Sequence, residues 1–173
     1  MLMGWGLGLA AWPVHGQGPG EARLALFGGP AYRTGAASQP FELGISGDVG
    51  LFRLGRSGLG AGALGEGGLY HPAISGKGSF YFSADAMLEC SPPAGATASL
   101  PVRPYAVAGY TRSFSATDTS VGTANAVNAG LGVDLPLRDG MLLRLEVRGR
   151  YTFADGTHGI ALRIGLVGSA SIQ

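Results

Sequence analysis

Apolar and polar residues alternate with a period of two along much of this chain. In the segment 41–51, every odd position except Gly47 is apolar, whereas the even positions include Glu42 and Asp48. The segment 143–151 repeats the pattern with an arginine or a glutamate at each even position. Successive side chains of a strand point to opposite faces of a sheet. The pattern therefore predicts a sheet with one apolar face and one charged face.

Segments of this kind recur between clusters of Gly, Pro, Asp and Ser, and no segment shows a sustained helical period. Eight strands are expected, at about residues 22–29, 41–52, 58–69, 79–90, 103–114, 123–135, 141–153 and 158–168. The Asp139-Gly140 pair suits a tight hairpin turn. Eight antiparallel strands of roughly 10–12 residues predict an all-β fold, an antiparallel up-and-down barrel.

Two physically opposite barrels share this alternation. A secreted, soluble lipocalin-like barrel has an apolar interior that binds a small apolar ligand. A transmembrane barrel turns its apolar face to lipid and its charges to the lumen. Only 13% of the residues are charged, Lys77 is the single lysine, and the polar face otherwise consists mostly of Gly, Ala and Ser. Such a face suits a narrow lumen better than a water-exposed surface, so the sequence favours the membrane barrel.

Aromatic residues near the predicted strand ends favour the same interpretation, because membrane barrels carry aromatic girdles at both interfaces. If the strands run up and down in order, one rim carries Phe41, Phe80, Phe82, Tyr151 and Phe153, and the other carries Tyr105. The apolar residues 1–16 are interpreted as an export signal peptide that delivers a single barrel domain, residues 17–173.

Residues 130–151, GLGVDLPLRDGMLLRLEVRGRY, resemble the penultimate hairpin of small OmpA-like and opacity-type outer-membrane barrels. In that family a G-x-G-x-D strand, here 130–134, turns into an L-R-x-E-x-R strand, here 143–148. The run Arg103-Pro-Tyr followed by Gly109-Tyr is similar to the family's fifth strand. The resemblance implies a porin-type barrel in the outer membrane of a Gram-negative envelope. It also implies contact with outer-membrane lipid and with the outer-membrane assembly machinery.

Charged residues on the lumen face must pair with one another, because an unpaired buried charge costs several kcal/mol. The expected lumenal charge network consists of Glu42, Asp48, Glu89, Asp134, Arg144, Glu146, Arg148, Arg150 and Arg163. The same parity places Arg23, Glu66, Asp85 and Arg112 in the lumen. Hairpin spacing puts Asp134 opposite Arg144, and it puts Arg163 near Arg148 with an acid between them. The interior of an eight-stranded barrel is just filled by side chains, so a wide pore is not expected.

Other chemistry finds little support in the sequence. The net charge of +1 gives no electrostatic reason to expect nucleic-acid binding. His15, His71 and His158 lack the spacing of metal ligands. Residues 60–65 match a dinucleotide fingerprint, but no amphipathic helix follows them, so no cofactor is expected. His158 and Ser169 fall at opposite ends of one strand and do not form a catalytic pair.

The sequence thus predicts a non-enzymatic outer-membrane barrel with a structural or surface-interaction role and a lumen plugged by salt bridges. The alternatives are the soluble lipocalin-like barrel and a narrow solute channel. The connections at the predicted outer end are short and rich in Ala, Ser, Thr and Gly. They identify no surface ligand.

Overall fold

The structure, a computed structural model, describes residues 20–35, 40–54, 58–72, 79–90, 102–116, 121–138 and 140–171. Its strands are β1 Glu21–Arg33, β2 Pro40–Leu54, β3 Leu59–Pro72, β4 Ser79–Cys90, β5 Arg103–Ala116, β6 Val121–Pro136, β7 Met141–Thr152 and β8 His158–Ser171. The predicted export signal lies outside the described residues. No helix in the described part of the chain is long and apolar enough to cross a membrane.

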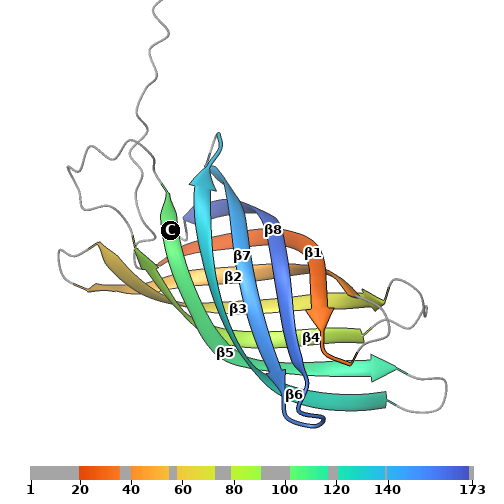
Figure 1. Cartoon of the computed structure of the whole chain (residues 1–173). Helices are drawn as coiled ribbons and strands as arrows, with labels where there is room; N and C mark the ends of the chain where they lie inside the picture. The colour runs from red at the N-terminus through yellow and green to blue at the C-terminus, as the bar shows by residue number, and fades with distance from the viewer. Residues whose placement is uncertain are drawn as a thin grey trace, which may run out of the picture.

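Each strand pairs in antiparallel fashion with its sequence neighbours, and β8 returns to pair with β1. The sheet therefore closes into a barrel whose strands are tilted around a common axis (Figure 1). All eight predicted strands are present, with ends that differ from the prediction by a few residues. The predicted eight-stranded up-and-down barrel is confirmed.

The two ends of the barrel are distinguished by what they connect. The proximal end is the end where Glu21 of β1 lies beside Ser171 of β8, so both chain termini leave from it. The distal end is the opposite end, where β1 joins β2, β3 joins β4, β5 joins β6 and β7 joins β8. Within the proximal half, a register shift between Gly50 and Phe52 marks a bulge in β2.

Apart from the bulge in β2, side chains alternate between the barrel interior and its outer surface. On β4, every second residue from Tyr81 to Glu89 is buried, and the residues between them are exposed. The outer positions hold large apolar side chains such as Leu24, Leu131 and Ile164, which are 71%, 69% and 62% exposed. The interior instead holds the charges. A soluble lipocalin-like barrel needs the reverse arrangement, so the structure does not support that alternative.

Strand β5 corrects two predicted positions. Tyr105 does not belong to an outer girdle, because its side chain is buried in the barrel interior. Arg112 does not face the lumen: it is exposed on the outside, with its guanidinium 5.6 Å from the centre of the Phe114 ring. One cause explains both errors, since a shift of one residue in phase exchanges the two faces of a strand. The corrected phase also brings Arg103 into the interior.

Candidate functional site

The interior of the barrel carries two groups of ion pairs. The distal cluster is formed by Glu42, Glu66, Tyr81, Asp85, Glu146, Arg148, Arg150 and Arg163. The proximal cluster is formed by Arg23, Asp48, Glu89, Asp134 and Arg144. Because inward side chains from all eight strands converge on a narrow lumen, residues more than a hundred positions apart in sequence come into contact.

Arg163 of β8 holds the distal cluster together. Its Nε and Nη2 atoms donate to the two carboxylate oxygens of Glu42 at 3.0 and 2.6 Å, a bidentate arrangement. Its Nη1 atom donates to Glu66 Oε2 and to Glu146 Oε1, both at 2.9 Å. The hydroxyl of Tyr81 donates to Glu42 and accepts a bond from Arg163 Nη2 at 3.1 Å. One guanidinium is thus shared among three carboxylates.

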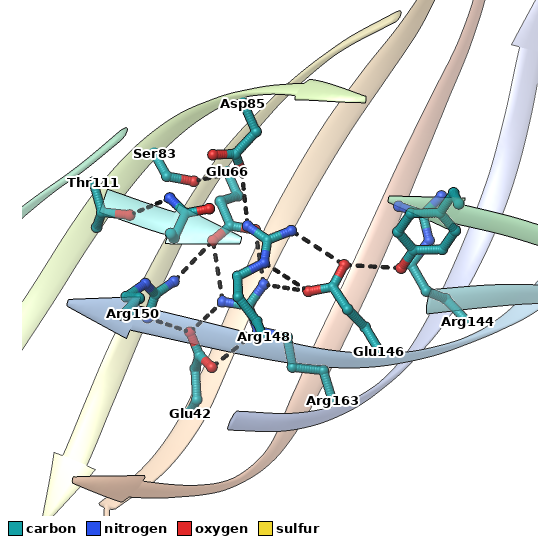
Figure 2. A network of polar contacts seen from close by, with 12 residues as sticks. Glu42, Glu66, Ser83, Asp85, Thr111, Arg144, Glu146, Arg148, Arg150 and Arg163 are labelled. Atoms are coloured by element: carbon teal, nitrogen blue, oxygen red, sulfur yellow. Dashed lines mark hydrogen bonds and ion pairs between the residues drawn. The ribbon is translucent and has the colours of Figure 1, made fainter. Parts of the chain in front are cut away.

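Two arginines of β7 complete the distal cluster (Figure 2). Arg148 lies 2.7 Å from Asp85 and 2.9 Å from Glu66 through its Nη1 atom, and its Nε lies 2.8 Å from Glu146. Arg150 contacts Glu42 and Glu66 at 3.2 and 3.0 Å. The guanidinium of Arg150 also lies 4.2 Å from the centre of the Tyr81 ring, within the range of a cation–π contact.

The proximal cluster has the same design and shares strands β2, β4 and β7 with the distal cluster. Arg144 binds both oxygens of Asp134 at 2.8 Å and reaches Asp48 at 3.1 Å. Arg23 contacts Asp48, Glu89 and Asp134 at 2.7, 2.8 and 3.2 Å. Two arginines and three acids therefore form a closed group in which Asp48 and Asp134 each bridge both guanidiniums.

Tyr105 connects the two clusters. Its hydroxyl donates to Glu146 Oε2 at 2.8 Å, and the guanidinium of Arg144 lies 4.8 Å from the centre of its ring. A tyrosine at this place must be buried with a hydrogen-bond partner, because an unsatisfied hydroxyl in the interior costs free energy. This requirement is the signal that sets the phase of β5.

Strand register explains most of the local pairs. Asp134 lies directly opposite Arg144, as the hairpin spacing predicts. On the next hairpin, Arg163 lies opposite Glu146 and one step from Arg148, so that Glu146 contacts both arginines. Glu146 is therefore the acid that separates two like charges on adjacent strands.

The structure places the nine residues of the predicted network inside the barrel, each with an ion-pair partner. Glu66, Asp85 and Arg23, predicted by parity to face the lumen, join the same clusters. Sequence reasoning missed Tyr81, Tyr105 and Arg103 as interior residues. Tyr81 was missed because the flanking Phe80 and Phe82 indicate only the outer, aromatic face of the strand.

The described interior holds seven carboxylates and six arginines. The carboxylates are Glu42, Asp48, Glu66, Asp85, Glu89, Asp134 and Glu146, and the arginines are Arg23, Arg103, Arg144, Arg148, Arg150 and Arg163. All these side chains are nearly or fully buried. The charges therefore almost cancel within a volume that excludes most water, which is the condition under which buried ion pairs persist.

The interior is filled below the distal end and open at it. Among the ion pairs of the proximal and middle parts, Leu64, Met87, Tyr105 and Val107 form one apolar cluster, and Ala25, Leu142 and Val167 form another. Toward the distal end, a cavity of about 570 Å³ opens above the ion pairs, with Arg148 and Arg150 at its base. Below this cavity, salt bridges and apolar side chains together fill the barrel.

At the distal rim, a small polar group ties β1 to the turn between β7 and β8. The hydroxyl and backbone N–H of Thr157 donate to Asp155 Oδ1 at 2.7 and 3.1 Å, and Arg33 Nη2 donates to Oδ2 at 2.7 Å. The hydrogen bonds from Thr157, helped by the charge of Arg33, hold the pKa of the Asp155 carboxyl below its usual range. Ionised Asp155 therefore accepts the hydrogen bonds that tie this turn to β1.

The other predicted rim residues lie on the outer surface near this end. Phe41, Phe80, Phe82, Tyr151 and Phe153 are all exposed. Phe80 and Phe82 meet Phe114 at ring-centre distances of 5.0 and 6.4 Å, and Tyr151 meets Phe153 at 5.7 Å. Aromatic side chains thus gather around the outside of the distal rim.

Neither histidine of the described chain takes part in a catalytic arrangement with Ser169. His158 begins β8 at the distal rim, with its ring 4.9 Å from that of Tyr151. Ser169 lies near the other end of the same strand, where its hydroxyl donates to the carbonyl of Gly140 at 3.5 Å. Among the described residues, no group of three or more His, Cys, Asp and Glu side chains is arranged to hold a metal ion.

The chain is similar in fold to several solved outer-membrane barrels. The chain is similar to the N-terminal β-barrel domain of Pseudomonas aeruginosa OprF, with a TM-score of 0.57 and 19% identity over 87% of this chain and 99% of that domain. Neisserial surface protein A gives a TM-score of 0.57 at 14% identity, covering 86% of this chain and 95% of that one. Ail, the attachment invasion locus protein of Yersinia pestis, gives 0.55 at 10% identity, covering 88% and 99%.

No family model matches the sequence, and no curated protein matches it. At these identities the similarity concerns the fold. It agrees with the apolar outer surface and the charged interior, and with the resemblance of residues 130–151 to such barrels. The chain is an eight-stranded β-barrel of the outer-membrane type.

Proposed function

We propose that this protein is a non-enzymatic barrel of the outer membrane whose lumen is plugged by salt bridges and whose role is structural or lies in surface interaction. The observation that carries the proposal is the pair of ion-pair clusters, which together with apolar side chains occupy the lumen below the distal cavity. A conducting pore needs a continuous water path, and these side chains occupy the cross-section.

The outer surface supports insertion in a lipid bilayer. Exposed leucine, isoleucine and valine side chains surround the barrel, and exposed aromatic residues gather at the distal rim. Membrane barrels place aromatic girdles where the hydrocarbon meets the headgroups. Phe41, Phe80, Phe82, Tyr151 and Phe153 mark one such interface in this proposal. The partners that follow are outer-membrane lipid and the machinery that assembles outer-membrane barrels.

A surface-interaction role is supported by the names of similar proteins. Two of them are described as a surface protein and as an attachment invasion locus protein. The distal rim of this chain offers a polar edge held by Arg33, Asp155 and Thr157. This edge lies beyond the exposed aromatic residues of the membrane interface and is the part of the barrel that can contact another surface.

Planar-bilayer recordings of the intact protein test the plug. We expect little or no stable single-channel conductance, because Arg163 and its carboxylates bridge the lumen. The variant Arg163→Ser, which removes the central guanidinium, is expected to give measurable openings. Arg138→Gln, on the exposed turn between β6 and β7, serves as the control that leaves the interior intact. Large, steady currents from the unmodified protein would overturn the proposal in favour of a solute channel.

A further inference from the structure

The cavity at the distal end of the lumen has the dimensions and lining of a binding site. This distal vestibule has a volume of about 570 Å³, and its base is formed by Arg148 and Arg150. Tyr70, Thr111, Ser113 and Thr152 contribute to its walls. Ligand sites for small molecules commonly measure about 300–1,000 Å³ and combine apolar or aromatic walls with a few polar groups.

The vestibule exists because small side chains occupy several inward positions of its walls. The inward positions on the distal side of the ion pairs include Ala31, Ala126 and Ala161, which leave space. Deeper in the barrel, the inward positions next to the ion pairs are filled by Leu64 and Met87. An eight-stranded barrel is narrow enough for ordinary side chains to fill it. The hollow is therefore specific to one end and is not a consequence of barrel size.

The polar groups of the vestibule suit a ligand that both donates and accepts hydrogen bonds. The Thr111 hydroxyl accepts a bond from Asn128 Nδ2 at 2.8 Å and keeps its proton to donate. The Ser113 hydroxyl donates to the carbonyl of Ala124 at 3.4 Å and can still accept, and Thr152 adds a third hydroxyl. Arg150 is only 10% exposed, and its Nε–H is buried without a hydrogen-bond partner. The ring of Tyr70 provides an apolar surface beside these groups. Hydroxyl groups, an N–H donor without a partner and an aromatic ring are the features that recognise a sugar.

The charges below the vestibule decide between a neutral and an anionic ligand. The distal cluster contains four carboxylates, Glu42, Glu66, Asp85 and Glu146, against three arginines, so its net charge is −1. At the rim, Arg33 is paired with Asp155 at 2.7 Å. An anion entering the vestibule is attracted by the nearby guanidiniums but is repelled by the net negative charge of the cluster. A neutral ligand is not subject to this repulsion.

We propose that the distal vestibule binds a neutral saccharide of one or two rings, with a sugar face on Tyr70 and hydroxyl groups on Thr111, Ser113 and Arg150. The site rests on the proposed plug, because the arginines of the plug form its base. The sugar comes either free in solution or as the end of a longer glycan, and both present the same chemistry to the vestibule.

Binding is tested by amide NMR on the folded chain in a detergent that has no sugar headgroup. The probes are maltose, its anionic analogue maltobionate and the longer maltoheptaose. Maltose is expected to shift signals of distal residues around 111–113, 122–126 and 159–161 and to leave the proximal half unchanged. Equal binding of maltoheptaose assigns the site to glycan ends, and its exclusion assigns the site to free sugars.

Matched variants show whether the vestibule is the site. Ser113→Leu fills the cavity and Tyr70→Leu removes the ring, and each is expected to weaken maltose binding about tenfold or more. Tyr70→Phe keeps the ring, and Arg138→Gln lies at the proximal end, so both are expected to bind as the unmodified protein does. Absence of maltose shifts, shifts confined to the proximal half, or tighter binding of maltobionate overturns the proposal. None of these outcomes depends on conductance, so the plug is tested separately.

Discussion

Each side chain of β7 faces either the outer surface of the barrel or the ion pairs of the lumen. Arginine is stable on the lumenal face, where carboxylates pair with it, and not on the outer face. Val147 is 50% exposed on the outer surface, between the inward Glu146 and Arg148. We predict that Val147→Arg lowers the free energy of unfolding in lipid vesicles by about 2–4 kcal/mol, the cost of arginine near the bilayer midplane. Denaturant titration in vesicles of fixed composition measures this change.

An arginine at a different depth in the membrane, near the interface, provides the control for this substitution. Phe153 is 54% exposed and lies in the turn after β7, at the distal rim. Phe153→Arg is expected to cost no more than about 1 kcal/mol, because arginine is tolerated near the interface. Equal losses at the two positions would contradict the assignment of the outer face to lipid.

Glu146 is the residue whose loss should disturb the interior most clearly. It contacts Arg148 at 2.8 Å and Arg163 at 2.9 Å, and it accepts a hydrogen bond from the Tyr105 hydroxyl at 2.8 Å. Glu146→Gln leaves two buried guanidiniums short of a charge, so we predict a loss of about 3–5 kcal/mol in unfolding free energy. Heat-modifiable gel mobility and denaturant titration both report the change.

A variant of Tyr105 separates the contribution of its hydrogen bond from that of the charge of Glu146. Tyr105→Phe removes only the hydroxyl that donates to Glu146, and about 1 kcal/mol is expected to be lost. The double variant should lose less than the sum of the two single losses, because the neutral glutamine carbonyl accepts the Tyr105 hydrogen bond less strongly than the carboxylate does. Strict additivity would mean that Tyr105 and Glu146 do not act together.

At the scale of strands, close approach of two backbones limits which residues fit. A Cβ atom added at Gly29 of β1 would fall on the carbonyl oxygen of Leu162 in β8, whereas one at Gly65 of β3 would meet nothing within 4 Å. We predict that Gly29→Ala destabilises the barrel by about 1–3 kcal/mol through overpacking.

Gly65→Ala is the matched control for this strand contact. Gly65 is exposed on the outer face, and alanine there is expected to leave stability unchanged or to raise it by up to about 1 kcal/mol. Thermal unfolding of both variants under one condition gives the comparison. Similar losses for the two glycines would show that the seam between β1 and β8 is not the limiting contact.

The strands differ in how well their sequences reveal their faces. On β7 an arginine or glutamate stands at every even position from Arg144 to Arg150, so the inward face was predictable. The turn before β7 sets the register that places Asp134 opposite Arg144. On β5 neither face is distinctly apolar, because Tyr105 and Val107 lie on one side and Tyr110 and Phe114 on the other. The phase there depends on partners across the lumen.

Contacts across the lumen were beyond the reach of sequence patterns for a physical reason. Arg163 meets Glu42 and Glu66, which are 121 and 97 positions away. Which acid lies at which depth depends on the stagger of all eight strands around the closed barrel, and a barrel fixes that stagger as a whole. The distal vestibule arises in the same way, from small residues on several strands at one depth.

At the scale of the whole molecule, the two ends of the interior differ. Ion pairs and apolar clusters together fill the proximal and middle parts, and hydroxyl-lined space opens at the distal end. Under the proposed plug, the recess is reached from the distal side. This arrangement is what we expect of a barrel that does not conduct and still presents a recess at its distal face.

The outer surface sets the conditions under which the barrel folds. Leu24, Leu131 and Ile164 are more than 60% exposed, and similar side chains surround the barrel. Contiguous apolar surface of this kind is not stable in water. We predict that the chain, unfolded in urea, regains its heat-modifiable compact form on dilution into detergent micelles or lipid vesicles and aggregates on dilution into buffer alone. Gel mobility with and without boiling, and light scattering, distinguish the two results. A folded monomer in detergent-free buffer would mean that the apolar exterior is covered in some other way, and the membrane assignment would then be wrong.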